Sequence, residues 1–411
     1  MAFFASHNPL SEWVSSSNDS LSLRLVSAAD VDDGVQGQNG SADAGAGDHD
    51  DDDDEDNGPP AQGAVFHPLY TYPVFGDEEK VFGYKDLDIK LYYAAGSLFT
   101  YLGFTYSARI GEGASKRIAP GVQPQDVVRM MSEKIPPGMT HNYDEFVKRV
   151  QSDETTFRPM GTKIHEYQAH GKAYEMYECT FTTPRFKEYH RRLQTFLVWF
   201  IEGASFLQES DTNWHFVLVF EKSGVPNHEV YKIVGYLSYY PFYHFPDKRR
   251  MRISQFIILP PFQKQGHGRA LYSTMMDRFI ADPNVVDVTV EDPNDFFQDM
   301  RDRCDVQRLL DAQALKGLAA PLARSHIEDV QRRFKLCKRQ ANRCIEIVLL
   351  HRLKRLDARA NKQYRLFVKA RIFRQNREVL ESIEFDERLD KLQSTYLGLI
   401  EDYRNVLESL Q

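Results

Sequence analysis

The sequence has few cysteines and no long apolar run. Its 411 residues include only four cysteines, which are too few for a disulfide framework and lack the close spacing of a metal site. This scarcity fits a reducing cytosolic or nuclear setting. The most apolar segment, FLVWFIEGASFL, is interrupted by Glu202 and is too short to span a bilayer. The amino terminus also lacks the basic start of a signal peptide. We therefore predict a soluble protein with no membrane partner.

Basic residues are missing from one acidic stretch. Residues 28–58 contain twelve Asp or Glu and no Lys or Arg, so removing them changes the formal charge from −8 to +4. Residues 50–56 are seven consecutive acids, which repel one another and cannot bury apolar surface. We expect residues 28–63 to form a disordered acidic insert, with binding of a basic partner as the alternative.

Aromatic residues are plentiful, with 27 Phe and 21 Tyr, and this indicates folded structure over most of the chain. Hydrophobic periodicity and turn residues predict an α+β fold. A strand within residues 1–27 joins an amino-terminal α+β domain at 64–157. A central domain of strands and helices follows at 158–294. From 295 to 411 only helical patterns remain, with Cys337 and Cys344 seven residues apart as buried packing residues.

Individual elements can be predicted within these parts. We expect strands at 20–26, 87–93, 99–108, 214–221, 230–240, 253–259 and 285–290, with further strands within 157–181. Helices are expected at 125–131, 143–150, 185–206, 266–281, 295–316, 324–354 and 362–410. Thr183 is expected to cap the helix at 185–206, because Pro184 suits a first helical turn.

A glycine turn lies at the centre of the chain, between the strand at 253–259 and the helix at 266–281. It reads QKQGHGR, from Gln263 to Arg269. Two glycines one residue apart allow close backbone approach to a ligand, and the following helix directs its positive end there. The pattern favours a phosphate or pyrophosphate ligand over an ordinary tight turn. The dinucleotide and Walker templates both fail, because the third glycine and the Gly-Lys-Ser/Thr sequence are missing.

The turn matches the Q/R-x-x-G-x-G/A motif of the GCN5-related N-acetyltransferases. Four segments in order, VFGYKDL, RLQTFLVWFIEGASF, ILPPFQKQGHGRALY and VTVEDPN, closely resemble the type B histone acetyltransferase catalytic subunits. The resemblance covers most of the chain except the acidic insert. It implies the mixed sheet with flanking helices of the GCN5-related fold, a preceding small α+β domain and a helical carboxy-terminal region.

The resemblance also implies an acetyl-CoA site with no metal. Phe256, Ile257 and Ile258 would present backbone groups to the pantetheine arm. The pyrophosphate would lie against Gln263, Lys264, Gln265, Gly266, His267, Gly268 and Arg269. Further cofactor contacts fall at Asn294 and, within the fungal-like pattern RDRCD, at Arg303. The alternatives are a place for Asn294 in the first turn of a helix and a surface ion pair for Arg303.

Transfer of an acetyl group to lysine needs a base, because the lysine ammonium has a pKa of ~10.4. Glu291, at the end of the strand 285–290, is the first candidate and resembles the family's proposed base. Asp292 is the second, although it could equally cap the next helix. The resemblance implies that Glu202 is a supporting acid, and its apolar segment would favour the protonated form through desolvation; the alternative is a structural hydrogen bond. His267 is better suited to lining the phosphate turn than to acting as base.

The resemblance also implies a function. The enzyme would be a histone lysine N-acetyltransferase that uses acetyl-CoA in direct transfer within a ternary complex. Its substrate would be the amino-terminal tail of newly made histone four. A WD-repeat histone chaperone would be its partner in cytoplasm and nucleus, without direct DNA binding. Candidate walls of the substrate groove are Trp214, Tyr240 and Tyr243, each of which could instead be core. Two alternatives stay open: an acetyltransferase for another amine, and a non-catalytic histone-binding scaffold.

Overall fold

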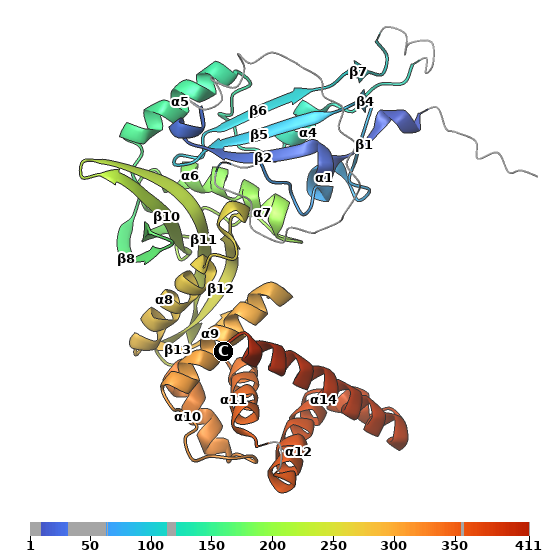
Figure 1. Ribbon diagram of the computed structural model, residues 1–411, viewed down its shortest axis with the longest axis vertical. Coiled ribbons are helices and arrows are strands. Elements are labelled where there is room, and N and C mark those ends of the chain that lie inside the picture. The colour runs from blue at the N-terminus through green and yellow to red at the C-terminus, as the bar shows by residue number, and fades with distance from the viewer. Residues whose placement is uncertain (1–9, 32–62, 64, 113–120, 355–356, 411) are drawn as a thin grey trace, which may run out of the picture. The chain divides into compact units, whose positions relative to one another are not determined.

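The computed structural model describes residues 10–31, 63, 65–112, 121–354 and 357–410 (Figure 1). It consists of two compact units. The first contains residues 1–238 and 256–267, and the second contains residues 239–255 and 268–411. Most of the expected acidic insert lies outside the described residues. The domain boundaries given above stay a prediction.

The amino-terminal part of the first unit is built on a three-stranded sheet. Strand β5 (Asp88–Ala94) lies between β2 (Leu21–Val26), which runs parallel to it, and β6 (Thr100–Thr105), which runs antiparallel. Helix α5 (Tyr143–Thr156) covers this sheet through Phe146 and Val150, which pack against Val26 and Ala94 (Figure 1). The strands predicted at 20–26, 87–93 and 99–108 are confirmed, as is the helix predicted at 143–150.

Smaller elements complete this part of the chain. Two short strand pairs join β1 (Val14–Ser16) to β3 (Lys80–Phe82) and β4 (Tyr84–Lys85) to β7 (Ala108–Arg109). Short helical segments are η1 (Ser11–Trp13), α1 (Ser17–Ser20), α3 (Tyr72–Phe75) and α4 (Val127–Ser132). Helix α4 confirms the one predicted at 125–131.

The central sheet is mixed, as predicted. Its strand order is β13-β12-β11-β10-β9-β8. Strands β8, β9 and β10 pair antiparallel, whereas β12 and β13 run parallel. Strand β13 (Val285–Val290) has the predicted bounds. The others are β8 (Thr162–Ala169), β9 (Lys172–Thr180), β10 (His215–Val225), β11 (His228–His244) and β12 (Lys248–Ile258).

The helix predicted at 185–206 is two shorter helices, α6 (Phe186–Leu193) and α7 (Thr195–Phe200). The Thr195 hydroxyl donates to the Arg192 carbonyl at 2.7 Å, and such side-chain bonds compete with the helical backbone pattern. The predicted cap is also wrong. Arg185 is the N-cap residue, with a left-handed φ of 64°, while the Thr183 hydroxyl accepts from the Thr180 amide.

Helix α6 carries a histidine that is fully buried among aromatic rings. The His190 ring centroid lies 4.6 Å from that of Phe216 and 5.1 Å from that of Phe181. Within the described residues, neither ring nitrogen of His190 has a hydrogen-bond partner. Burial lowers the pKa of His190 from 6.5 to about 4. Because the folded-state pKa is depressed, this histidine contributes stability above pH 6.5 that is lost as the pH falls toward 4.

This burial predicts a pH-dependent stability difference. Between pH 7.5 and 5.5, protonation of His190 in the unfolded chain should cost the wild type about 1.4 kcal/mol of unfolding free energy. The variant His190→Phe keeps an aromatic ring and cannot be protonated, so it should lack this loss. Urea unfolding of both proteins at the two pH values measures the difference. An equal pH dependence would show that His190 does not titrate as its burial implies.

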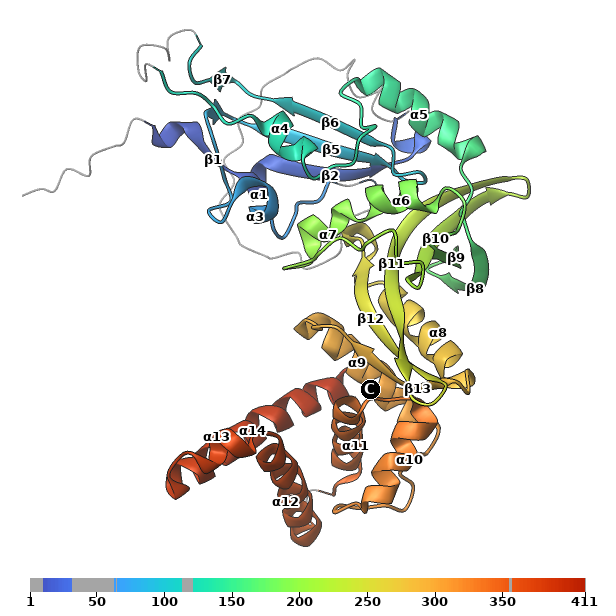
Figure 2. The ribbon, with the colours of Figure 1, turned by 180° about the vertical axis from the view of Figure 1, so that it is seen from behind.

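The second unit is dominated by helices, as predicted for the carboxy-terminal region. They are α8 (His267–Ala281, whose first residue belongs to the first unit), α9 (Asp295–Asp311), α10 (Arg324–Phe334), α11 (Lys338–Arg352), α12 (Ala358–Gln375), α13 (Arg377–Glu381) and α14 (Phe385–Glu408). Figure 2 shows α14 beside α12. The helix predicted at 324–354 is interrupted because Lys335 adopts a left-handed conformation with φ 52°. Cys344 is buried as expected, whereas Cys337 is only half-buried.

Candidate active site

The glycine turn lies between β12 and α8. A short 3-10 turn, η3 (Pro260–Phe262), comes after the strand, and α8 begins at His267. Gly266 has a φ of 86° and Lys264 one of 57°, both in the left-handed region. A Cβ added to Gly266 would meet no atom within 4 Å. The backbone of the turn is therefore open on that side, and glycine is needed for its conformation.

Two glutamine side chains stabilise the turn from within. The Gln263 amide donates to the Ile258 carbonyl at 2.8 Å, and the Gln265 amide donates to the Pro261 carbonyl at 2.9 Å. The Gln263 side chain thus bonds back to the last residue of β12, and the Gln265 side chain bonds back to η3. The Gln263 backbone amide also donates, to the Pro260 carbonyl at 3.2 Å. Contact of Gln263 and Gln265 with acetyl-CoA stays a prediction.

The hairpin of β8 and β9 also contacts the turn. His170, at the hairpin's tip, is 3.1 Å from the Gln265 carbonyl through Nε2. The Tyr167 hydroxyl is 2.8 Å from Nδ1 of His267. These contacts join residues about a hundred positions apart, so no local sequence signal identifies Tyr167 and His170. They fix the backbone of the turn from the first unit.

His267 is buried, with a relative exposure of 1%, and its ring centroid is 4.4 Å from that of Tyr174. Burial, together with the nearby His170, lowers the pKa of His267 to about 4, so its imidazole is neutral at pH 7. Its side chain faces the protein interior and cannot serve as the base or line the phosphate turn. A cofactor contact of this residue would therefore be made by its backbone.

The residues at this turn suit an anionic group. The first turn of α8 contains no acidic residue, and a helix amino terminus favours negative charge. Lys264 and Arg269, on either side of the glycines in the sequence, are both exposed. The open face of Gly266 allows the close approach that a pyrophosphate needs. These features fit the pyrophosphate of acetyl-CoA.

The end of β12 precedes the turn. Ile257 is buried, and Phe256 and Ile258 are half-buried. On β11, a Cβ added to Gly235 would lie 2.3 Å from the Ile257 carbonyl oxygen, so only glycine permits this approach. The parallel pairing of β12 with β13 runs from Arg249 to Ile253. The three residues assigned to the pantetheine arm thus lie beyond the last residue of β12 that pairs with β13.

Glu291 follows β13 directly and is exposed. Its backbone amide donates to the Ile253 carbonyl at 2.9 Å, which extends the pairing with β12 by one bond. The Ser254 hydroxyl donates to Oε2 of Glu291 at 2.6 Å. The carboxylate is therefore held by a hydrogen bond and still accessible to a substrate. Ser254 was not predicted, although a serine within the apolar run ISQFII was a possible signal.

Asp292 is exposed and adopts a left-handed φ of 34°. It does not cap α9, so that alternative is wrong. Asn294 is the N-cap residue, and its side-chain oxygen accepts from the Phe297 amide at 2.9 Å. Arg303 makes an ion pair with Asp299, one turn earlier on α9. Both residues have the structural roles given above as alternatives, and their cofactor contacts stay predictions.

The remaining candidate residues differ in their exposure. Glu202 is exposed in the turn after α7, so the desolvation expected for it is not found. Trp214 is half-buried immediately before β10. Tyr240 is half-buried against Phe242, with ring centroids 4.8 Å apart. Tyr243 is 72% exposed near the end of β11, so it is not a core residue.

Three family models match successive parts of the chain. The model for the histone acetyl transferase HAT1 N-terminus matches residues 13–202, and that for the acetyltransferase (GNAT) family matches 172–300. The model for the fungal HAT1 C-terminal region matches 302–354. The GNAT match spans β9 to β13 and includes the glycine turn and Glu291. The predicted acetyltransferase fold is confirmed, and such a domain uses acetyl-CoA.

Whole-chain relatives agree with these matches. The histone acetyltransferase type B catalytic subunit of Mycosarcoma maydis is 39% identical over 83% of this chain and 83% of its own. The catalytic subunit of Cryptococcus neoformans var. neoformans serotype D is 36% identical, over 97% of this chain and 98% of its own length. The catalytic subunit of Mus musculus is 36% identical, over 84% of this chain and 88% of its own length. This chain belongs to the family of histone acetyltransferase type B catalytic subunits.

Proposed function

We propose that this enzyme transfers the acetyl group of acetyl-CoA directly to the ε-amine of lysines in the amino-terminal tail of newly synthesised histone four. The observation that carries the proposal is the hydrogen-bonded but accessible carboxylate of Glu291, at the end of the strand that follows the turn helix. Family membership supports a histone as the protein substrate, because the relatives are named histone acetyltransferases.

Acetyl-CoA supplies an acyl group activated as a thioester. The chain's residues supply its binding and the removal of a proton. The open turn around Gly266 suits the pyrophosphate, and the β12 segment from Phe256 to Ile258 suits the pantetheine arm. Glu291 accepts a proton from the lysine ammonium, whose unperturbed pKa is ~10.4. The neutral amine then forms a bond to the acetyl carbon while the thioester C–S bond breaks, and CoA would leave as the thiol with a second proton from the amine. Ser254 occupies Oε2, so Oε1 is the oxygen that takes the proton. Asp292 and Glu202 supply further negative charge for a basic tail.

Direct transfer is supported by the state of the cysteines. Burial raises the pKa of the Cys179 thiol to about 12 and that of Cys304 to about 11. Burial also raises the pKa of Cys344. Such thiols are poor nucleophiles near pH 7, because the thiolate is the reactive form. An acetyl-cysteine intermediate at these three residues is therefore disfavoured, and a ternary complex of enzyme, acetyl-CoA and peptide is favoured.

The proposed setting follows the family. A WD-repeat histone chaperone is the proposed partner, and the enzyme would act in cytoplasm and nucleus on histone that is not yet bound to DNA. No helix in the part of the chain that the structure describes is long and apolar enough to cross a membrane. Binding of the chaperone can be tested by co-purification of the two proteins.

A substrate comparison tests the proposed function. We expect labelled acetyl-CoA to acetylate a histone-four tail peptide, and we expect loss of labelling when every lysine in the peptide is replaced by arginine. Spermidine at the same amine concentration should react much more slowly. Preferred transfer to spermidine would favour an acetyltransferase for another amine. Tight peptide binding without any transfer would favour a histone-binding scaffold.

A further inference from the structure

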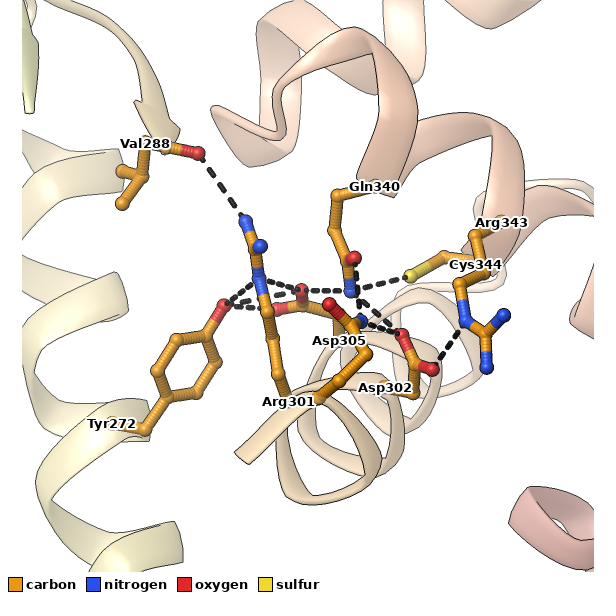
Figure 3. A network of polar contacts seen from close by, with 9 residues as sticks. Tyr272, Val288, Arg301, Asp302, Asp305, Gln340, Arg343 and Cys344 are labelled. Atoms are coloured by element: carbon orange, nitrogen blue, oxygen red, sulfur yellow. Dashed lines mark hydrogen bonds and ion pairs between the residues drawn. The ribbon is translucent and has the colours of Figure 1, made fainter. Parts of the chain in front are cut away.

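A buried arginine connects the turn helix with the strand that ends at Glu291. Arg301, on α9, is 4% exposed. Its Nε donates to the Tyr272 hydroxyl on α8, and its Nη2 donates to the Val288 carbonyl on β13, each at 3.3 Å (Figure 3). One planar guanidinium thus contacts both elements. The Val288 amide also donates to the Lys335 carbonyl at 2.8 Å, so both backbone groups of this residue are held.

Asp305 holds the arginine in this position. It lies one turn further along α9 and is 1% exposed, with Oδ2 3.7 Å from Nε of Arg301. The Tyr272 hydroxyl donates to the Asp305 carboxylate, at 3.1 Å from each oxygen. Burial raises the pKa of Asp305 to about 6, although Arg301 and Tyr272 favour the carboxylate. The group is therefore mainly ionised at pH 7.5 and pairs with the guanidinium.

Helix α11 completes the network from the carboxy-terminal region. The Gln340 amide donates to Asp305 at 2.9 Å and to Asp302 at 3.0 Å. Asp302 also accepts from Arg343 (Figure 3). Two carboxylates, an arginine and a glutamine on two helices thus fix the orientation of Arg301. Burying these charged groups costs free energy, and apolar side chains of similar volume could take their place without loss of stability.

We propose that Tyr272, Arg301 and Asp305 are positioning residues that set the distance between α8 and β13. This proposal rests on the proposed function, because β13 leads to Glu291 and α8 follows the turn. Val288 is three residues, or roughly 10 Å of extended strand, from Glu291. A shift of about 1 Å at a reacting group can lower a rate by as much as about a hundredfold. The network thus gives the carboxy-terminal helices a part in catalysis without contact with the substrate.

The variant Tyr272→Phe tests the proposal, since it removes the hydroxyl and keeps the ring. We expect kcat for the histone-four peptide to fall about tenfold, because Arg301 loses its link to α8. The Kd of CoA, measured by calorimetry, should change less than threefold, because the turn itself is unaltered. The matched control is Tyr364→Phe. Tyr364 is equally buried in the second unit, and its hydroxyl donates to the Glu346 carbonyl at 3.0 Å, away from α8 and β13.

The two tyrosine variants should melt at similarly reduced temperatures, while only Tyr272→Phe loses kcat. Equal kcat values in the two variants would overturn the proposal and assign the network a purely structural role. If Tyr272→Phe does not fold, Arg301→Lys takes its place. Lysine keeps the positive charge near Asp305, but its single ammonium group cannot reproduce the two hydrogen bonds of the guanidinium to Tyr272 and Val288. The same fall in kcat is therefore expected. An inactive wild type would instead contradict the proposed function.

Discussion

Replacing Glu291 by glutamine should lower kcat at pH 7.5 by about a hundredfold or more, since a positioned general base contributes roughly 10²- to 10⁴-fold. The amide is similar in size and can still accept from Ser254, so the fold and the KM for acetyl-CoA should change little. Without the base, the reaction depends on lysine that solvent has already deprotonated. The kcat of Glu291→Gln should therefore rise by about tenfold per pH unit toward pH ~10.

The control for this variant is Asp295→Asn. It removes the same charge four residues further along, from an exposed position in the first turn of α9. Its kcat should stay within about twofold of the wild type, because an exposed charge interacts only weakly with other groups through water. Steady-state kinetics with the histone-four peptide between pH 6.5 and 9.5 would compare all three proteins. Equal kcat values for Glu291→Gln and wild type would exclude Glu291 as the base.

Replacing Gly266 by alanine should raise the KM for acetyl-CoA by about 10- to 100-fold. The added Cβ would occupy the open face of the turn, where it would prevent close approach of the pyrophosphate to the backbone. The loss of one charge-assisted hydrogen bond, about 1.5–3 kcal/mol, corresponds to this range. Calorimetry with CoA should show a similar loss of affinity, which makes the result independent of turnover.

Gly76→Ala is the control for backbone strain. Gly76 has a φ of 84°, against 86° for Gly266, and a Cβ added there also meets no atom within 4 Å. Its ψ of 169° lies in a backbone region that is essentially limited to glycine, so this alanine should cost about 1–3 kcal/mol of stability, at least as much as the one at Gly266. Only Gly266→Ala should affect CoA binding. If both variants bind CoA like the wild type, the turn is not the pyrophosphate site.

Elements with clear local limits could be predicted from the sequence. Strand β13 has the predicted bounds, because Asp282-Pro283 ends the preceding helix and an acidic pair follows Val290. The helix at 185–206 could not be predicted in detail. Its division into α6 and α7 occurs where the Thr195 hydroxyl bonds to the Arg192 carbonyl, and apolar periodicity does not indicate such a bond.

The site was predictable where it depends on backbone conformation. The glycine spacing of the turn indicated close backbone approach to a ligand, and the open face of Gly266 allows it. Side-chain burial was not predictable, because it depends on distant parts of the chain. Glu202, in an apolar segment, is exposed, whereas His267, between two glycines, is buried against Tyr174. Ser254 as the partner of Glu291 follows from the parallel register of β12 and β13.

The central claim is that the enzyme moves an acetyl group directly from acetyl-CoA to a lysine side chain of the histone-four tail. The most direct measurement is tandem mass spectrometry of peptide and enzyme after acid quenching of a single turnover. We expect one acetyl group on a lysine ε-amine of the peptide and none on the enzyme's cysteines. A peptide without acetyl groups, or an acetyl-cysteine whose decay matches peptide labelling, would contradict the account.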